Sequence, residues 1–277
     1  MSQLDTISQF ATKLSREAGE IMLESRSSPI EISFKDRLNL VTDYDLRVEA
    51  FLIEQIRKNF PDHHILSEES EDAADLSKFS GPLWILDPID GTTNFAHGIP
   101  HTAASVAFAD EGEVQVGAVC APFLNETFSA IRGGGSFLNE KPINCASPKE
   151  LAHTLVTTGF PYVRDDLDPL MARARAVLAH CRDLRRLGAA SIDISWVGCG
   201  RLGAFYEDLA PWDVAAGLLI AREAGAVLTR FSPLPSSGRY LELPESFNGT
   251  NIIVAPPTSS ESLTKLLNLE LQNGELD

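Results

Sequence analysis

Two aspartates in the stretch WILDPIDGTTNF, residues 84–95, have the spacing and the neighbours of metal ligands. Asp87 and Asp90 follow an apolar run that is typical of a buried strand, and the proline between them predicts a turn. Thr92 and Thr93, which come next, are residue types that open helices. Carboxylates beside a helix N-terminus offer hard oxygen ligands for a divalent cation and backbone N–H groups for an anion. This combination suits a metal-bound phosphate.

An Asp-Pro turn before a capped helix would give the same local pattern, so other segments must supply further acids. They do so at the ends of predicted elements, at Glu68, Glu69, Asp213, Asp43 and Asp45. Each of these acids has an ordinary structural reading by itself, as solvated surface, a first-turn acid or an N-cap. Together they provide the carboxylates from which a Mg²⁺ site is built. Two or three such ions can activate a water and stabilise a leaving oxygen in phosphoryl transfer.

The elements that must position these acids are indicated by hydrophobic periodicity. The first half predicts helices at 4–25 and 45–60, strands near 64–66 and 83–87, and an antiparallel meander over 103–144. The second half alternates helices at 167–180, 189–199, 212–224 and 258–272 with strands in RRLG, GAFYE, AVLTR and NIIVAPP. These patterns predict an α/β (α+β) fold. We expect one unit, residues 1–277, with two tightly packed halves at about 1–147 and 148–277.

Composition excludes several classes of protein. The 39 Asp and Glu against 23 Lys and Arg give a net charge of −16, which makes direct nucleic-acid binding unfavourable but permits a phosphorylated substrate if cations are bound. The four cysteines have neither CxxC spacing nor a His-rich partner, which disfavours zinc and disulfides. No run is apolar enough to span a bilayer, and the first residues lack a secretory pattern. We expect a cytoplasmic protein without membrane contact.

The segments LVTDYD, SEES, WILDPIDGTTNF and APWDVAAG resemble, in order and spacing, the signatures of inositol-monophosphatase-like phosphatases. These belong to a lithium-sensitive, Mg²⁺-dependent superfamily with fructose-1,6-bisphosphatases and phosphoadenosine-phosphate phosphatases. The resemblance covers nearly the whole chain and rests on a highly specific motif combination. It implies a layered α-β-α-β-α sandwich of the sugar-phosphatase type. It also implies a phosphoric monoester hydrolase that cleaves a small polyol or sugar phosphate, such as inositol 1-phosphate, by direct water attack.

The resemblance also implies the ligands of two or three Mg²⁺ ions. Glu68, Asp87 and the carbonyl of Ile89 would hold the first ion. Asp87, Asp90 and Asp213 would hold the second, and Glu68 would help to hold a third.

Catalytic and phosphate-binding roles follow from the same resemblance. Thr92, hydrogen-bonded to Asp45, would act with Glu68 to orient and deprotonate the attacking water. The amides of Gly91 and Thr92 would bind the phosphate. Lys35 would place its ammonium group near the metal site, although a solvated surface lysine is the ordinary alternative.

The residues that would contact the alcohol part of the substrate are Asp90, Ala190 and Glu207. A carboxylate such as Glu207 can accept hydrogen bonds from two vicinal hydroxyls. The segment FYEDLAPWD is one residue shorter than in most family members. Glu207 could therefore be displaced, or Asp208 could take its place.

The substrate and the partners stay open at this point. Phosphoadenosine-phosphate, histidinol phosphate and fructose 1,6-bisphosphate are alternative substrates, and a mainly protein-binding regulatory role is an alternative of another class. A homodimer is a further expectation from the resemblance.

Three other features do not point to a separate site. His97 and His101 flank a Gly and a Pro that disfavour a continuous helix, and histidine is not a ligand that Mg²⁺ prefers. The triple glycine at 133–135 lacks the Lys-Ser/Thr of a phosphate loop and fits a hairpin. A small basic cluster could touch a substrate phosphate or a neighbouring subunit, but a solvated face is the ordinary reading; it comprises Arg182, Arg185 and Arg186.

Overall fold

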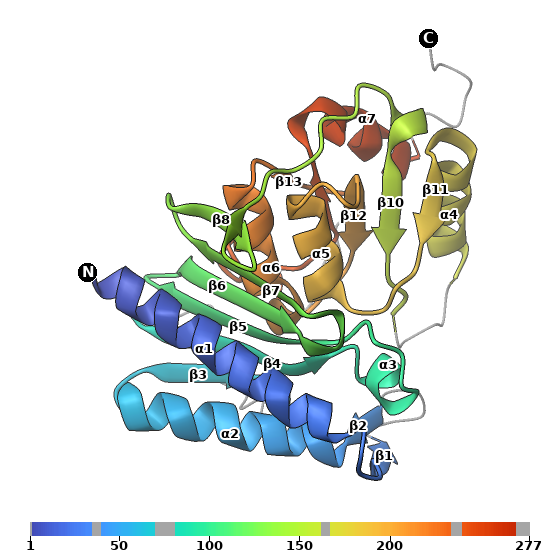
Figure 1. Ribbon diagram of the computed structural model, residues 1–277. Coiled ribbons are helices and arrows are strands. Elements are labelled where there is room, and N and C mark those ends of the chain that lie inside the picture. The colour runs from blue at the N-terminus through green and yellow to red at the C-terminus, as the bar shows by residue number, and fades with distance from the viewer. Residues whose placement is uncertain (1, 35–39, 70–80, 162–166, 234–239, 270–277) are drawn as a thin grey trace.

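The computed structural model describes residues 2–34, 40–69, 81–161, 167–233 and 240–269. Within this part of the chain, helices and sheets alternate in five layers (Figure 1). Two N-terminal helices, a seven-stranded sheet, two central helices, a five-stranded sheet and two outer helices follow one another. The expected α-β-α-β-α layering is confirmed.

The seven-stranded sheet forms the second layer. Its strands pair in chain order, with the first two parallel and the rest antiparallel: β3 (His64–Ser67), β4 (Leu83–Asp90), β5 (Ala103–Asp110), β6 (Glu113–Ala121), β7 (Glu126–Ile131), β8 (Gly135–Leu138) and β9 (Lys141–Pro142). The helices α1 (Gln3–Glu24) and α2 (Asp43–Asn59) cover one face, and their apolar sides bury residues such as Met22 and Leu52 against it. A separate antiparallel pair, β1 (Ile32–Phe34) and β2 (Leu40–Thr42), precedes α2.

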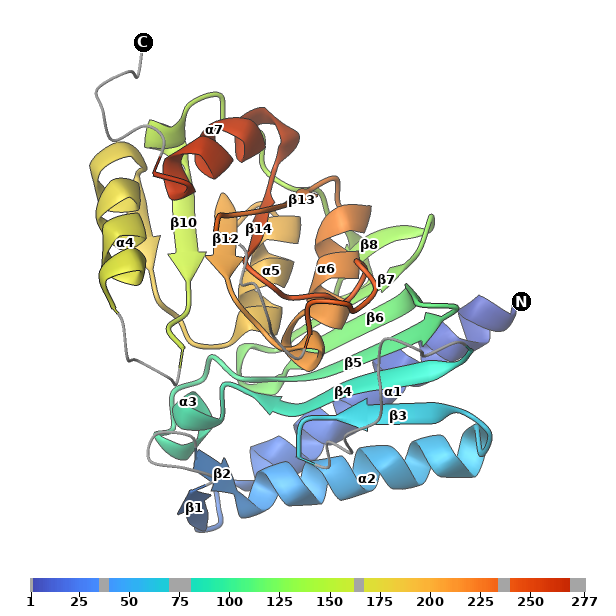
Figure 2. The ribbon, with the colours of Figure 1, turned by 180° about the vertical axis from the view of Figure 1, so that it is seen from behind.

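The five-stranded sheet forms the fourth layer. Its spatial order is β11 (Asp183–Arg185), β10 (Leu155–Thr158), β12 (Ala204–Glu207), β14 (Ile252–Ala255) and β13 (Val227–Arg230). The helices α5 (Ala190–Gly198) and α6 (Pro211–Glu223) fill the space between the two sheets and are buried on nearly all sides. The outer face is covered by α4 (Asp168–His180) and α7 (Pro257–Leu267), as Figure 2 shows.

Several predicted boundaries are wrong in detail. The strand β4 does not end in a turn at Pro88 but continues to Asp90, with a register shift against β5 between Asp87 and Asp90. The helix α2 starts at Asp43, so its N-cap is Thr42, and Asp45 closes a capping box instead of capping the helix. The strand predicted in RRLG lies earlier, at β11. The meander over 103–144 is confirmed by β5 to β9.

The candidate site lies at the C-terminal end of β4. The strand β4 leads directly into the short helix α3 (Thr92–Ala96), and residues at the starts of α5 and α6 contact the same strand end. The end of β4 and the starts of three helices thus converge where the WILDPIDGTTNF motif lies. Among the described residues, no helix combines the length and the apolar character that a bilayer crossing requires.

Candidate metal centre

Three carboxylates meet at the end of β4. Asp87, Asp90 and Asp213 each offer an oxygen, and these oxygens all lie within 4.8 Å of one another. Asp87 and Asp90 belong to β4, whereas Asp213 lies in the first turn of α6, where its side chain accepts a hydrogen bond of 3.0 Å from the amide of Ala210. The fold therefore brings together acids that the sequence separates widely.

The electrostatics of this cluster favour a bound cation. Both carboxylate oxygens of Asp87 are buried and have no hydrogen-bond partner among the described residues. Burial, and then the nearby charges of Glu68, Asp90 and Asp213, raise the pKa of Asp87 well above its usual value. Burial and the same neighbourhood also raise the pKa of Asp213. Since unpaired buried charges are costly, oxygen ligands arranged in this way fit a divalent cation such as Mg²⁺.

Asp90 also links the seven-stranded sheet to the central helix α5. Its Oδ1 accepts a hydrogen bond of 3.1 Å from the amide of Ala190, and its Oδ2 accepts one of 2.7 Å from the amide of Ser191. These amides open α5, so a residue of β4 caps a helix that lies about 100 residues further along the chain. Burial raises the pKa of Asp90 to about 6, although the hydrogen bonds from Ser191 lower it.

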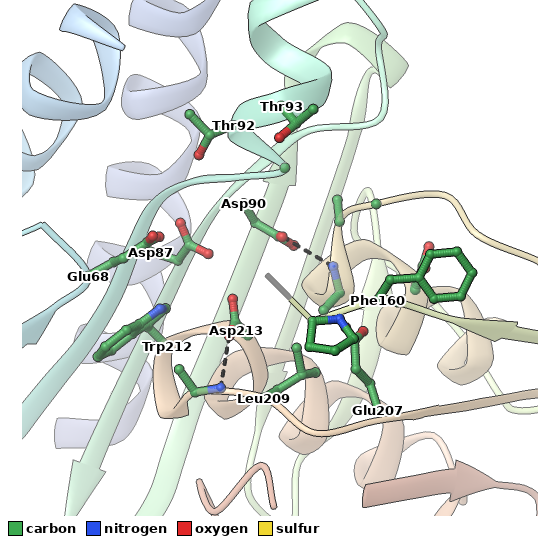
Figure 3. Close-up of a pocket in the computed structure, with 18 of the residues that line it drawn as sticks. Glu68, Asp87, Asp90, Thr92, Thr93, Phe160, Glu207, Leu209, Trp212 and Asp213 are labelled. Atoms are coloured by element: carbon green, nitrogen blue, oxygen red, sulfur yellow. Dashed lines mark hydrogen bonds between the residues drawn. The ribbon is translucent and has the colours of Figure 1, made fainter. Parts of the chain in front are cut away.

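Glu68 extends the acidic end of the site. It follows β3 and lines the same cavity as the three aspartates. Figure 3 shows Glu68 beside Asp87, with Asp213 projecting from α6 toward them. Its oxygens are not part of the close group of three, but its charge contributes to the raised pKa of Asp87. Glu68 therefore belongs to the acidic end of the cavity, outside the close group of three aspartates.

Thr92 lies at the start of α3, two residues after Asp90. Its hydroxyl can donate to Oδ1 of Asp45 or to the carbonyl of Ile89, both at 3.1 Å. Gly91 precedes it in a left-handed conformation with a φ of 86°. A Cβ at Gly91 would come within 3.0 Å of two backbone oxygens, which explains why glycine is needed at this position.

Asp45 is held rigidly behind Thr92. It is 1% exposed, and its Oδ2 accepts a hydrogen bond of 2.7 Å from the amide of Thr42, the N-cap of α2. Burial raises the pKa of Asp45 to about 6, against the lowering effect of its hydrogen bonds from Thr42. The structure therefore brings together Thr92 and Asp45, as the resemblance implied.

The three carboxylates of Asp87, Asp90 and Asp213 form one end of a cavity with a volume of about 510 Å³. Its opposite end is formed by Phe160, which follows β10, and by Glu207, the last residue of β12 (Figure 3). Burial raises the pKa of Glu207 to about 8, although the charge of Arg186 lowers it. Asp208 also lines the cavity, but it accepts a hydrogen bond of 3.2 Å from the amide of Asn251 and is more exposed. Glu207 therefore reaches the cavity despite the shortened segment.

The sequence reasoning missed a buried network behind the cavity. Asp193 in α5 lines the cavity, accepts a hydrogen bond of 2.9 Å from the hydroxyl of Thr157 and lies 2.8 Å from Nε2 of His101. The structural reading of His101 is confirmed, since its side chain is buried and does not belong to the group of Asp87, Asp90 and Asp213. His97 is exposed after α3. No sequence signal links residues so far apart.

Three further expectations concern Ala190, the triple glycine and Lys35. Ala190 lies at the edge of the cavity, as expected. In the triple glycine, Gly133 and Gly134 lie in the turn between β7 and β8, and Gly135 is the first residue of β8, so the expected hairpin is confirmed. Lys35 lies outside the described residues.

Comparisons with known proteins agree over nearly the whole chain. The model of the inositol monophosphatase family matches residues 3–272. A protein of Pasteurella multocida named Nus factor SuhB is 36% identical, over 92% of this chain and 94% of its own length. Inositol monophosphatase 3 of Solanum lycopersicum is 37% identical, over 81% of this chain and 87% of its own length. A solved IMPase structure from Thermotoga maritima superposes with a TM-score of 0.80 at 31% identity, over 95% of this chain and 97% of that one.

Proposed function

Because this chain belongs to the inositol monophosphatase family, we propose that it is a Mg²⁺-dependent phosphomonoesterase that hydrolyses a small polyol or sugar phosphate such as inositol 1-phosphate. One observation carries the proposal most directly. Three buried or half-buried carboxylates converge within 4.8 Å, and the oxygens of Asp87 have no hydrogen-bond partner in the described part of the chain. A divalent cation would compensate these charges.

The proposed ligands divide into two overlapping sets. Glu68, Asp87 and the carbonyl of Ile89 would hold one Mg²⁺, and Asp87, Asp90 and Asp213 would hold a second, with a loosely held third beside Glu68. When bound, these ions supply positive charge to the phosphate oxygens and lower the pKa of a nearby water. The side chains are already oriented by the ends of β4 and α6.

Thr92 and Asp45 would orient the attacking water. If the hydroxyl hydrogen of Thr92 points to Asp45, the oxygen of Thr92 presents a free lone pair and can accept a hydrogen bond from water. Glu68 would assist in taking the proton. The water oxygen would bond to phosphorus as the bond between phosphorus and the alcohol oxygen breaks, and a solvent water would protonate the leaving oxygen, which balances the proton that Glu68 takes up. No covalent phospho-enzyme is formed in this scheme.

The remaining proposed contacts fix the substrate. The amides of Gly91 and Thr92 would donate to phosphate oxygens. On the alcohol side, Asp90, Ala190 and Glu207 would contact the polyol, with Glu207 accepting hydrogen bonds from hydroxyl groups. Asp208 is the alternative for this last role, but its exposure and its bond to Asn251 favour Glu207.

A panel of phosphomonoesters tests this function. Phosphate release should be measured for inositol 1-phosphate, phosphoadenosine-phosphate, histidinol phosphate and fructose 1,6-bisphosphate, in Mg²⁺ and in chelator. We expect turnover of at least one polyol or sugar phosphate, abolished by chelation and inhibited by Li⁺. Absence of Mg²⁺-dependent release from every compound would refute the proposed activity.

A regulatory role is the second candidate. It is supported by the name Nus factor SuhB that several relatives carry, including those of Pasteurella multocida and Haemophilus influenzae. The net charge of −16 favours contact with protein over direct contact with nucleic acid. Affinity capture should compare the wild type with the Asp87→Asn variant. A specific protein partner retained by a catalytically inactive variant would favour this role, and its absence would argue against it.

A further inference from the structure

One positively charged side chain, that of Arg186, lines the cavity and has no role in the proposed mechanism. Seven acidic residues line the cavity, but Arg186 is its single cationic side chain within the described ranges. Arg186 lies between β11 and α5, in the cluster that the sequence alone assigned to a solvated face. We propose that Arg186 binds a second anionic group, a phosphate or a carboxylate, on the non-reacting end of the substrate. This inference rests on the proposed function, whose substrate class it narrows.

Local packing holds the guanidinium group at the cavity. Its Cζ lies 5.7 Å from the ring centroid of Phe160, within the range of a cation–π interaction. The chain also makes room for it at Gly188, where an added Cβ would stand 2.4 Å from Nη1 of Arg186. Gly188 has a φ of 93°, so both its conformation and its space require glycine. The group is thus positioned, although the residue is exposed.

Burial raises the pKa of Glu207 and of Asp193 and the charge of Arg186 lowers it, but neither acid forms an ion pair with Arg186. No ion pair or hydrogen bond joins Arg186 to any carboxylate in the part of the chain that the structure describes. The carboxylate of Glu207 instead packs over Gly159, where a Cβ would stand 2.0 Å from both oxygens. Arg186 therefore keeps its donors available.

The other two acids at the Glu207 end of the cavity, Asp193 and Asp208, already have hydrogen-bond partners other than Arg186. Asp193 pairs with His101 and with Thr157, and Asp208 accepts from the amide of Asn251. At the opposite end, bound cations would compensate the aspartates of the metal cluster. An available guanidinium then faces a cavity whose remaining polar groups suit hydroxyls. Because guanidinium presents a planar fork of donors, it suits phosphate or carboxylate better than a neutral alcohol.

The test compares ligands that differ only at the far end. One pair is sorbitol 6-phosphate and 6-phosphogluconate, which exchange a hydroxymethyl group for a carboxylate. The other is fructose 6-phosphate and fructose 1,6-bisphosphate, which adds a phosphate. Affinities should be measured by calorimetry with Ca²⁺ in place of Mg²⁺, so that binding is read directly. We expect the wild type to prefer the second anion by roughly tenfold in at least one pair.

Three variants locate the preference. In Arg186→Gln the affinity ratio should fall to about one, through weaker binding of the doubly anionic ligand only. Arg186→Lys should keep part of the preference, because it retains charge but loses the fork. Arg182→Gln, the control, removes the same charge from the same basic cluster outside the cavity lining and should keep the full ratio.

Two results would overturn the inference. One is a wild type that binds both ligands of each pair with equal affinity. The other is an Arg186→Gln variant that keeps the wild-type affinity ratio, either because neither affinity changes or because both fall equally. The carboxylate and phosphate pairs show which anion is selected. Failure of the proposed function would appear separately, as absence of Mg²⁺-dependent phosphate release by the wild type.

Discussion

At the scale of single residues, the site depends on side chains that the fold leaves incompletely satisfied. The spacing of Asp87 and Asp90 made them candidate metal ligands, but an Asp-Pro turn fitted it equally well, and only further acids such as Asp213 favoured a metal site. The pairing of Thr92 with Asp45 came only from the family resemblance, and the structure places the two in hydrogen-bond contact. The partnership of His101 and Asp193 was out of reach, since nothing in the sequence encodes a contact between residues 92 positions apart.

Thr92→Val should separate catalysis from metal binding. The substitution removes the hydroxyl that links Asp45 to the site but keeps the branched shape of the side chain. We expect kcat to fall by about a hundredfold or more, on the scale of a lost positioned proton acceptor, while the Mg²⁺ affinity measured by calorimetry changes little. Thr92→Ser, which keeps the hydroxyl, is the control and should retain most activity. Equal turnover in the valine variant and the wild type would exclude the proposed role.

Glu207 should make the metal-free protein less stable as pH rises. Its pKa is about 8 in the folded protein, above the ordinary value of 4.5 for a glutamate, so the folded state keeps a proton that the unfolded state releases. Stability from this group is full below pH 4.5 and is lost as pH rises toward about 8. Glu207→Gln should remove on the order of 1 kcal/mol or more of this dependence in denaturant unfolding in chelator. An unchanged slope between pH 5 and 8 would contradict this account.

At the scale of elements, the site is a junction between β4 and the starts of three helices. Periodicity predicted these elements because their buried faces repeat regularly. It failed at Pro88, where a turn was expected. The strand continues there because proline tolerates an extended backbone, and the register shift between Asp87 and Asp90 makes the missing N–H acceptable. Sequence periodicity also could not show that Asp90 caps α5, since that contact depends on the packing of two layers.

Ser191→Ala tests the junction between β4 and α5. The hydroxyl and the amide of Ser191 both donate to Asp90, so the variant loses one of two charge-assisted bonds. We expect a loss of about 1–2 kcal/mol in the free energy of unfolding and weaker Mg²⁺ binding, because Asp90 is less firmly oriented. Ser195→Ala, which breaks a bond within α5 only, should leave Mg²⁺ affinity unchanged. Metal affinities that are equal in the two variants would show that this hydrogen bond does not position Asp90.

At the scale of the whole molecule, the five layers bring Asp213 of the second predicted half to Asp87 and Asp90 of the first. The composition and the alternating patterns predicted an α/β chain, and the family resemblance supplied the layer order. Neither could supply the state of assembly, which depends on surface complementarity. We predict a homodimer on family grounds. Sedimentation should therefore give twice the chain mass of 30.1 kDa, and a monomer at micromolar concentration would contradict this.

The central claim is that the carboxylate cluster holds Mg²⁺ for phosphate ester hydrolysis, and Asp87→Asn tests it most directly. The variant keeps the shape of the side chain but removes a charge that burial and four neighbouring acids disfavour. In chelator it should unfold at the same temperature as the wild type or a higher one, which shows that it folds.

The decisive measurement is Mg²⁺-dependent phosphate release by Asp87→Asn, with the best substrate of the wild type. The account predicts a fall in turnover of about a thousandfold or more, as expected when charge stabilisation is removed at a reacting phosphate. Turnover close to that of the wild type would contradict it.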